Sequence, residues 1–173
     1  MAKKGYIIEK RISAKDVEAL NRSAVSAEDI DGGTLVSLEG YSNGVFTAKK
    51  SAGGLGNYMA YNPSEHLAKV GDNYVTISKD PRDYTNLASR TFDVFKPQTG
   101  VDVIGITDGN IAIGQTIAVG SFLEQGTAGY EAKATSTAGT TSFKVIAIEN
   151  QPFPQAGIGM ENAKVYVCEV AQN

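Results

Sequence analysis

The stretch that decides the fold is Asp31-Gly-Gly-Thr-Leu-Val-Ser-Leu-Glu-Gly40, followed by Asn43-Gly-Val-Phe-Thr-Ala-Lys-Lys-Ser-Ala-Gly53. Residues 34–38 and 45–48 are predicted strands on either side of a turn at residues 42–44. Asn-Gly between two such segments is the strongest short-range signal for a β-hairpin. We therefore predict a hairpin here.

A later stretch echoes this one. Gly114-Gln-Thr-Ile-Ala-Val-Gly-Ser-Phe122 precedes Gly129-Tyr-Glu-Ala-Lys-Ala-Thr-Ser-Thr-Ala-Gly139. Both copies have the order strand, glycine turn, strand and small-residue loop. The echo predicts two related β units with equivalent hairpins.

Short apolar segments continue along the chain at spacings of roughly ten residues, which is typical of a sandwich or barrel. The further strands predicted are residues 58–61, 74–77, 91–95, 101–106, 115–119, 129–134, 142–149 and 164–170. Residues 151–159, with two prolines and two glycines, are predicted to be a long non-strand connection. The fold class is all-β, with short-stranded sandwich or barrel units, an extended N-terminal arm and one short helix.

Three parts follow from this pattern. Residues 1–25 form the N-terminal arm, residues 26–90 a first β unit with a surface excursion, and residues 91–173 a C-terminal β-barrel or sandwich unit. The short helix lies in the arm, because Ser13-Ala-Lys-Asp16 resembles a capping box and the helix would run through Leu20.

Charge separates the arm from the rest of the chain. The 173 residues have a net charge of −3, and 42% are hydrophobic. This composition is that of a folded protein and argues against a nucleic-acid binder, which needs a basic footprint. Residues 1–25 nevertheless carry a net charge of +3 and the remainder −6. A basic arm on an acidic body predicts docking onto an acidic partner, and a frayed terminus is the alternative.

The arm supplies the candidate binding residues. Its cations would pair with the partner, while its apolar side chains would be buried against it. The residues are Lys3, Lys4, Tyr6, Ile7, Ile8, Lys10 and Arg11.

Cys168 is the single cysteine, so no intramolecular disulfide can form. It lies in the apolar segment 165–170, which predicts a buried, inert thiol. No long apolar run follows the basic N-terminus, so we expect neither a signal peptide nor a membrane span. These features fit assembly in a reducing cytoplasm.

No motif in the sequence supports catalysis. The glycines at 53–56 and 157–159 lack the Lys-Ser/Thr of a phosphate loop. His66, the only histidine, is expected to be a surface or structural residue. Asp80, Asp83 and Asn86 do not follow an EF-hand spacing, so turn formation is preferred to calcium binding. We expect no enzyme activity, no cofactor and no metal.

Tyrosines cluster in one part of the chain, at positions 58, 61, 74 and 84. A row of aromatic residues could bind sugars or stack bases. Such residues more often belong to a core or a protein interface, where tyrosine is favoured.

Several segments together resemble the head decoration proteins of tailed bacteriophages. The resemblance covers most of the chain as a pattern of spacing and residue type, without a single diagnostic motif. Its segments are the basic leader, Ile30-Asp-Gly-Gly-Thr-Leu-Val-Ser-Leu38, Tyr58-Met-Ala-Tyr-Asn-Pro-Ser-Glu65, Asp83-Tyr-Thr-Asn86, Thr91-Phe-Asp-Val-Phe95, Gly114-Gln-Thr-Ile117, Ser142-Phe-Lys-Val-Ile-Ala-Ile-Glu149 and Val165-Tyr-Val-Cys-Glu-Val170.

The resemblance implies a non-enzymatic virion protein on the outside of the capsid shell, assembled in the host cytoplasm and held by the major capsid protein. The chain itself is a further candidate partner; nucleic acid and membrane are not. The rival hypothesis is a carbohydrate-binding or host-surface-binding β module, such as a head fibre, using the tyrosines and the loop at 79–90.

Overall fold

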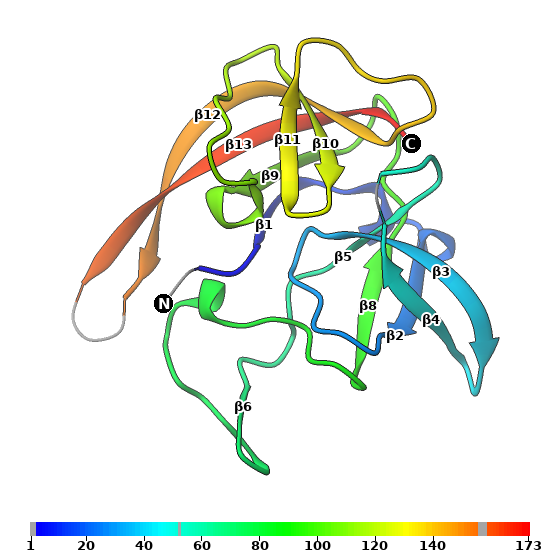
Figure 1. Cartoon of the computed structure of the whole chain (residues 1–173), viewed down its shortest axis with the longest axis vertical. Helices are drawn as coiled ribbons and strands as arrows, with labels where there is room; N and C mark the ends of the chain where they lie inside the picture. The colour runs from blue at the N-terminus through cyan, green and yellow to red at the C-terminus, as the bar shows by residue number, and fades with distance from the viewer. Residues whose placement is uncertain (1–2, 52, 156–158) are drawn as a thin grey trace.

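The computed structural model describes residues 3–51, 53–155 and 159–173, and about half of these lie in β-strands (Figure 1). The strands are β1 (Ile7–Arg11), β2 (Asn21–Val25), β3 (Leu35–Ser42), β4 (Val45–Lys50), β5 (Tyr58–Ala60), β6 (Ala68–Val70), β7 (Asn73–Val75), β8 (Thr91–Phe95), β9 (Val103–Thr107), β10 (Phe122–Gly126), β11 (Gly129–Lys133), β12 (Ser142–Pro154) and β13 (Met160–Gln172). Four short 3₁₀ helices connect them: η1 (Ser13–Lys15), η2 (Glu18–Leu20), η3 (Pro81–Asp83) and η4 (Asp108–Asn110). The all-β prediction is confirmed.

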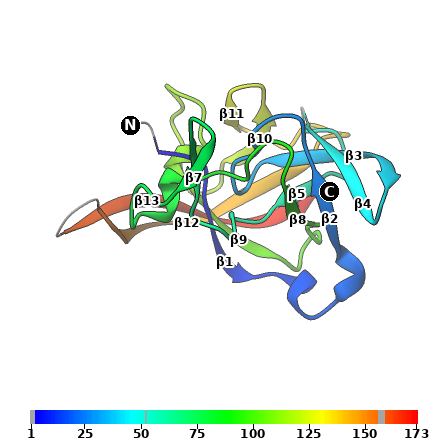
Figure 2. The same ribbon diagram turned by 90° about the horizontal axis from the view of Figure 1, so that it is seen from below.

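The strands form a barrel beside an open sheet (Figures 1 and 2). The sheet has six strands in the order β1-β9-β13-β12-β10-β11. The closed barrel has the order β2-β4-β3-β5-β8, and β6 with β7 makes a separate two-stranded hairpin. Closure removes the free strand edges of the barrel.

The predicted hairpin is the β3–β4 hairpin of the barrel. Asn43 has φ 53° and Gly44 has φ 86°, which matches a type I′ turn. Asparagine tolerates the left-handed region and glycine has no side chain to clash there, so the sequence fixes the turn. The predicted strand at 91–95 is also confirmed, as β8.

The N-terminal segment is not an extended arm, which corrects the prediction. Residues 7–11 are β1, paired antiparallel with β9, and residues 21–25 are β2 of the barrel. The predicted helix is two 3₁₀ turns without a side-chain cap. Ser13 instead donates from its N–H (2.7 Å) and its hydroxyl (2.5 Å) to the Asp102 carboxylate. A tertiary hydrogen bond therefore replaces the local capping box.

The two echoing stretches do not occupy equivalent places. The first forms the barrel hairpin, whereas residues 115–119 form no strand and β11 pairs with Phe122–Gly126 instead. Gly114 and Gly120 have φ values of 86° and 92° at either end of the non-strand segment. The repeat in the sequence is therefore accidental, because one stretch belongs to the barrel and the other to the open sheet.

Two predicted boundaries also differ from the structure. β8, placed in the second unit, belongs to the barrel, so the division falls after residue 95 rather than residue 90. The predicted non-strand connection at residues 151–159 is wrong at residues 151–154, because β12 runs to Pro154 and pairs with β13 from Met160 onward in a long hairpin. Prolines are tolerated there because each occupies a position of a two-stranded edge where no N–H is needed.

One hydrophobic core joins the barrel to the sheet. It includes Leu35, Met59 and Phe95 from the barrel strands, packed with Ile104 and Phe143 of the sheet. A second, smaller cluster fills the barrel itself. The shared core predicts that barrel and sheet unfold together.

Cys168 is fully buried in the shared core, as predicted. Burial raises the pKa of its thiol, so the reactive thiolate is disfavoured at neutral pH. We expect a thiol reagent to label the native protein at least about a hundredfold more slowly than the protein unfolded in urea. Equal labelling rates in native buffer and in urea would contradict the burial of this residue.

Candidate interaction surface

The six-stranded sheet has an inner face in the shared core and an opposite face, here called the outer face. Ile7 is 1% exposed and points inward, so the next residue, Ile8, points to the outer face. Among the described residues, neither core cluster includes an outer-face side chain.

An apolar row crosses the middle of the outer face. Ile8 lies opposite Gly105, Gly105 opposite Val167, and Val167 opposite Ala147. A Cβ at Gly105 would lie 2.8 Å from a Val165 methyl carbon and 2.9 Å from the Ile8 Cβ. The missing side chain at Gly105 therefore lets its neighbours close over the strand, which leaves Ile8 half-buried and Val167 buried.

Charged side chains flank this row. The Lys10 ammonium donates to the Glu149 carboxylate at 2.8 Å. Arg11 and Lys144 are exposed in the neighbouring row, where Lys144 lies opposite Glu169. Such exposed pairs contribute only about 0–1 kcal/mol each. The outer face therefore presents a small apolar strip between ionic side chains.

Of the seven predicted binding residues, some are engaged within the protein and others remain at its surface. Ile7 cannot anchor a partner because it is buried in the protein's own core, and this corrects the prediction. Lys3 is held in an ion cluster, and Tyr6 packs edge-on against Phe153 at 5.7 Å. The residues still available at the surface are Lys4, Ile8, Lys10 and Arg11.

The ion cluster joins the N-terminal segment to η3 and β13. The Lys3 ammonium lies 2.8 Å from Asp80 and 2.9 Å from Asp83. The Arg82 guanidinium contacts both Asp80 and Glu161 at 2.7 Å. Arg82 also lies over the Phe153 ring at 4.3 Å, a cation–π contact.

Asp80, at the centre of the ion cluster, carries its negative charge in the folded protein. Burial alone would raise the pKa of Asp80, but hydrogen bonds from Arg82 and Lys3 outweigh it and lower the pKa to about 2. Asp80 is completely buried and Arg82 is 2% exposed. The segment around η3 is therefore an interior element, and the predicted surface excursion is wrong there.

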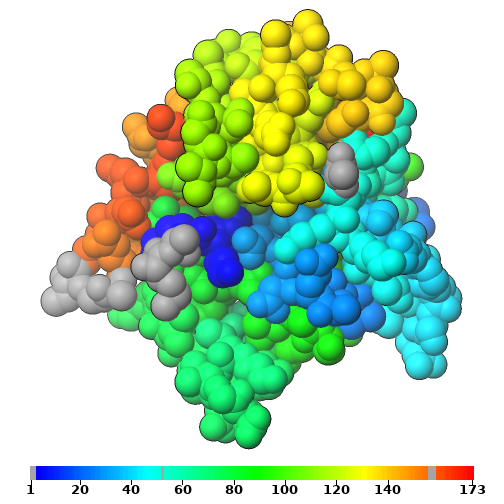
Figure 3. Space-filling view, in the orientation of Figure 1, coloured from blue at the N-terminus to red at the C-terminus, as the bar shows by residue number. Residues whose placement is uncertain are grey.

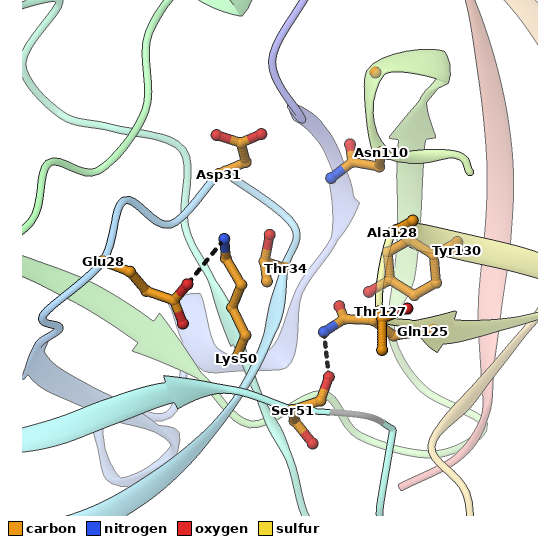
Figure 4. A pocket seen from close by; sticks show the side chains of 13 residues that line it. Glu28, Asp31, Thr34, Lys50, Ser51, Asn110, Gln125, Thr127, Ala128 and Tyr130 are labelled. Carbon is orange, nitrogen blue, oxygen red and sulfur yellow. Dashed lines mark hydrogen bonds and ion pairs between the residues drawn. The ribbon is translucent and has the colours of Figure 1, made fainter. Parts of the chain in front are cut away.

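A cavity of about 400 Å³ lies between the barrel and the β10–β11 turn (Figure 4). Its buried polar side chains already have partners in the barrel. Asn110 donates to the Gly32 carbonyl at 2.7 Å, and the Tyr130 hydroxyl donates to the Gly33 carbonyl at 2.8 Å.

Gln125, on the same wall, makes three further hydrogen bonds to the barrel. At the mouth, Lys50 pairs with Glu28 at 3.3 Å (Figure 4). We interpret this cavity as part of the packing interface between barrel and sheet, because its buried polar groups already form hydrogen bonds within the protein.

The other candidate motifs contribute no site. His66 is exposed and stacks on Tyr84, with ring centroids 5.0 Å apart. Tyr84 is buried, Tyr61 packs against Phe95, and Tyr74 lies under Arg90, so the tyrosines form no common platform.

The remaining predictions concern metals, phosphate loops and membranes. Across residues 3–51, 53–155 and 159–173, no cluster of three or more His, Cys, Asp and Glu is arranged to hold a metal ion. The glycine stretch at 157–159 falls mostly outside the described residues. In the part of the chain that the structure describes, no helix has the length and apolar character needed to cross a membrane.

The chain is thus defined as an all-β protein with a five-stranded barrel joined to a six-stranded sheet. No protein-family model matches its sequence, and a comparison with curated proteins finds no match. Among solved structures it is similar to the head fiber gp8.5 N base of bacteriophage phi29, with 12% identity and a TM-score of 0.44 over 88% of this chain and 95% of that chain.

Proposed function

We propose that this chain is a non-enzymatic structural protein of a phage virion, which binds the outside of the head shell and stabilises it by contacting major capsid protein subunits. The observation that carries the proposal is the outer face, where the half-buried Ile8 lies beside the exposed Lys10 and Arg11 on β1. The sequence resemblance to phage head decoration proteins supports the same partner. The protein would assemble in the host cytoplasm and remain on the virion exterior.

Modest contacts are sufficient for this role. Completing the burial of one half-buried isoleucine contributes about 1 kcal/mol, and each exposed ion pair contributes less. A protein that touches two or more neighbouring subunits gains affinity through effective concentration. If it binds only the expanded shell, mass action stabilises that shell.

The test is co-sedimentation of purified protein with empty expanded shells. Ile8→Thr combined with Arg11→Ala keeps a β-branched residue in β1 and removes the apolar and cationic contacts. We expect its apparent affinity to fall at least about tenfold, with greater loss at low salt.

The matched control is Lys69→Ala with Val70→Ala, a pair of exposed residues on β6, which belongs to a separate two-stranded sheet. This control should bind like the parent. Unchanged binding of the β1 variant, with an unchanged melting curve, would remove the outer face as the docking surface.

A second candidate function rests on a different observation. Tyr41 is 65% exposed on the β3–β4 hairpin, and its ring packs on Phe46 with centroids 4.8 Å apart. An exposed aromatic face of this kind suits a sugar ring on a host surface. Under this alternative, Tyr41→Ala abolishes retention on cell-wall material and leaves shell binding unchanged, while the β1 variant does the reverse.

A further inference from the structure

The β12–β13 hairpin extends beyond the sheet as a two-stranded β-ribbon. β9 ends at Thr107, opposite Val165, while β12 and β13 continue to pair as far as Pro154 and Met160. The ribbon projects from the body in both ribbon views and is visible at one side of the surface (Figures 1, 2 and 3). One side of residues 160–164 therefore has no strand neighbour among the described residues.

The hydrogen-bond pattern between β1, β9 and β13 determines which way the backbone N–H and C=O groups of residues 160–164 point. The Thr107 N–H donates to the Tyr6 carbonyl at 3.1 Å, so Thr107 bonds to β1 and Ile106 turns toward β13. Ile106 lies opposite Tyr166, so Tyr166 faces β9. Since alternate residues point to the same side, Lys164, Asn162 and Met160 direct their N–H and C=O groups away from β12.

The other end of the ribbon gives the same assignment. The Gln155 N–H donates to the Gly159 carbonyl at 3.1 Å, which makes 155 and 159 a bonded pair. Hydrogen-bonded and non-hydrogen-bonded pairs alternate along an antiparallel ladder, so Phe153 and Glu161 form the next hydrogen-bonded pair. The Pro154–Met160 and Pro152–Asn162 pairs are therefore non-hydrogen-bonded. Both prolines thus lie where no cross-strand N–H is needed.

The remaining strand edges are protected. On β12, Pro152 and Pro154 have no N–H to offer a partner. At β1, Asn62 accepts from the Ile7 N–H and donates to the Ile7 carbonyl, both at 2.8 Å. On β11, Tyr130 accepts from the Ala112 N–H at 3.0 Å.

Short or irregular strands protect the other edges. Beyond its pairing with β5 at Leu35 and Val36, β3 has a bulge between Glu39 and Tyr41, and β6 and β7 have three residues each. The free side of residues 160–164 carries no bulge or proline in the described chain. It therefore differs from the edges that are blocked.

The ion cluster holds this ribbon in place. Arg82 contacts Glu161 at 2.7 Å and covers the Phe153 ring, so both strands of the ribbon are fixed to η3. A fixed edge loses less conformational entropy on binding than a mobile one.

We propose that the free edge of β13, formed by Met160, Asn162 and Lys164, takes an extended, carboxylate-bearing segment of the shell subunit as an added strand. This inference rests on the proposed function. Main-chain hydrogen bonds would supply the affinity, as in other β-augmentation complexes. Glu161 is engaged by Arg82, so the free charge along this edge is that of the exposed Lys164, which favours a carboxylate in the partner. A second copy would offer the same lysine and no free carboxylate.

The experiment compares Asn162→Pro with Asn162→Ala in the shell co-sedimentation assay. Proline removes the outward N–H but no bond to β12, because residue 162 is a non-bonded position facing Pro152. Alanine removes the side chain and keeps the N–H. We expect Asn162→Pro to bind shells about tenfold more weakly, while Asn162→Ala binds like the parent and both melt like the parent.

The outcomes separate this inference from the proposed function. A parent protein that does not bind shells overturns both. A parent that binds, together with an Asn162→Pro variant that binds equally well, overturns the added strand alone. Loss of a dimer on Asn162→Pro in analytical ultracentrifugation, with shell binding intact, would identify a second copy as the occupant and overturn the shell segment.

Discussion

Replacing Arg82 with alanine is expected to lower the free energy of unfolding by about 3–5 kcal/mol, the cost of breaking a buried ion pair by removing one partner. The guanidinium is 2% exposed and neutralises Asp80, which is completely buried. Its loss also removes the contact to Glu161 at 2.7 Å and the cation–π contact with Phe153. Urea unfolding followed by near-ultraviolet circular dichroism measures the change.

The matched control is the double variant Asp80→Asn with Arg82→Met. The asparagine oxygen can still accept the Arg82 backbone N–H bond that Asp80 accepts at 2.9 Å, and methionine fills much of the arginine volume. Removing both charges together avoids an unpaired buried ion, so this variant should lie within about 1–2 kcal/mol of the parent. If the single variant is as stable as the parent, the ion cluster does not hold the ribbon.

The stability difference between the parent and the double variant should depend on pH, and the lowered pKa of Asp80 determines the direction. The pKa of Asp80 is lowered from its ordinary 3.8 to about 2 in the folded protein. A lowered folded-state pKa gives stability that is present above pH 3.8 and is lost as the pH falls through about 2. The parent should therefore lose stability relative to the double variant as the pH falls from about 4 to about 2, and a difference that stays constant over this range would contradict the assignment.

The sequence predicts the elements whose signals are local. The Asn43-Gly44 turn defines its hairpin because both residues suit the left-handed backbone that the turn requires. The strand at 91–95 alternates apolar and polar residues, as a half-buried strand does. β2, by contrast, begins with Asn-Arg-Ser and is placed by pairing with β4 and β8, which leaves no periodic pattern to detect.

For the candidate surface too, local features could be predicted from the sequence, whereas features set by strand pairing could not. Its basic charge sets the N-terminal segment apart, but its sequence does not show which of Ile7 and Ile8 faces the core. That choice depends on the register with β9, where Ile7 lies opposite Ile106 and Ile8 opposite Gly105. Arg82 was missed because its polar neighbours resemble a surface loop, whereas its partner Glu161 is 79 positions away.

The Gln125 side chain links the barrel to the sheet, and its replacement provides a test of their cooperativity. Its amide oxygen accepts from the Leu35 N–H at 2.5 Å, and its amide nitrogen donates to the carbonyls of Leu35 at 2.9 Å and Ser51 at 2.6 Å. Leu35 is completely buried, so water cannot replace the lost acceptor in the native fold. The cost of leaving buried groups unpaired is about 1–3 kcal/mol for each group.

Gln125→Ala is therefore expected to lower the free energy of unfolding by about 2–4 kcal/mol while keeping a single transition, because Leu35, Met59 and Phe95 remain in the shared core. Differential scanning calorimetry and tyrosine fluorescence should report the same midpoint. Gln115→Ala is the matched control: Gln115 accepts one exposed bond from Ala132, and its loss should cost at most about 0.5 kcal/mol. Two separate transitions in Gln125→Ala would show that the barrel and the sheet are joined mainly by these hydrogen bonds, and that the apolar contacts between them are too weak to couple their unfolding.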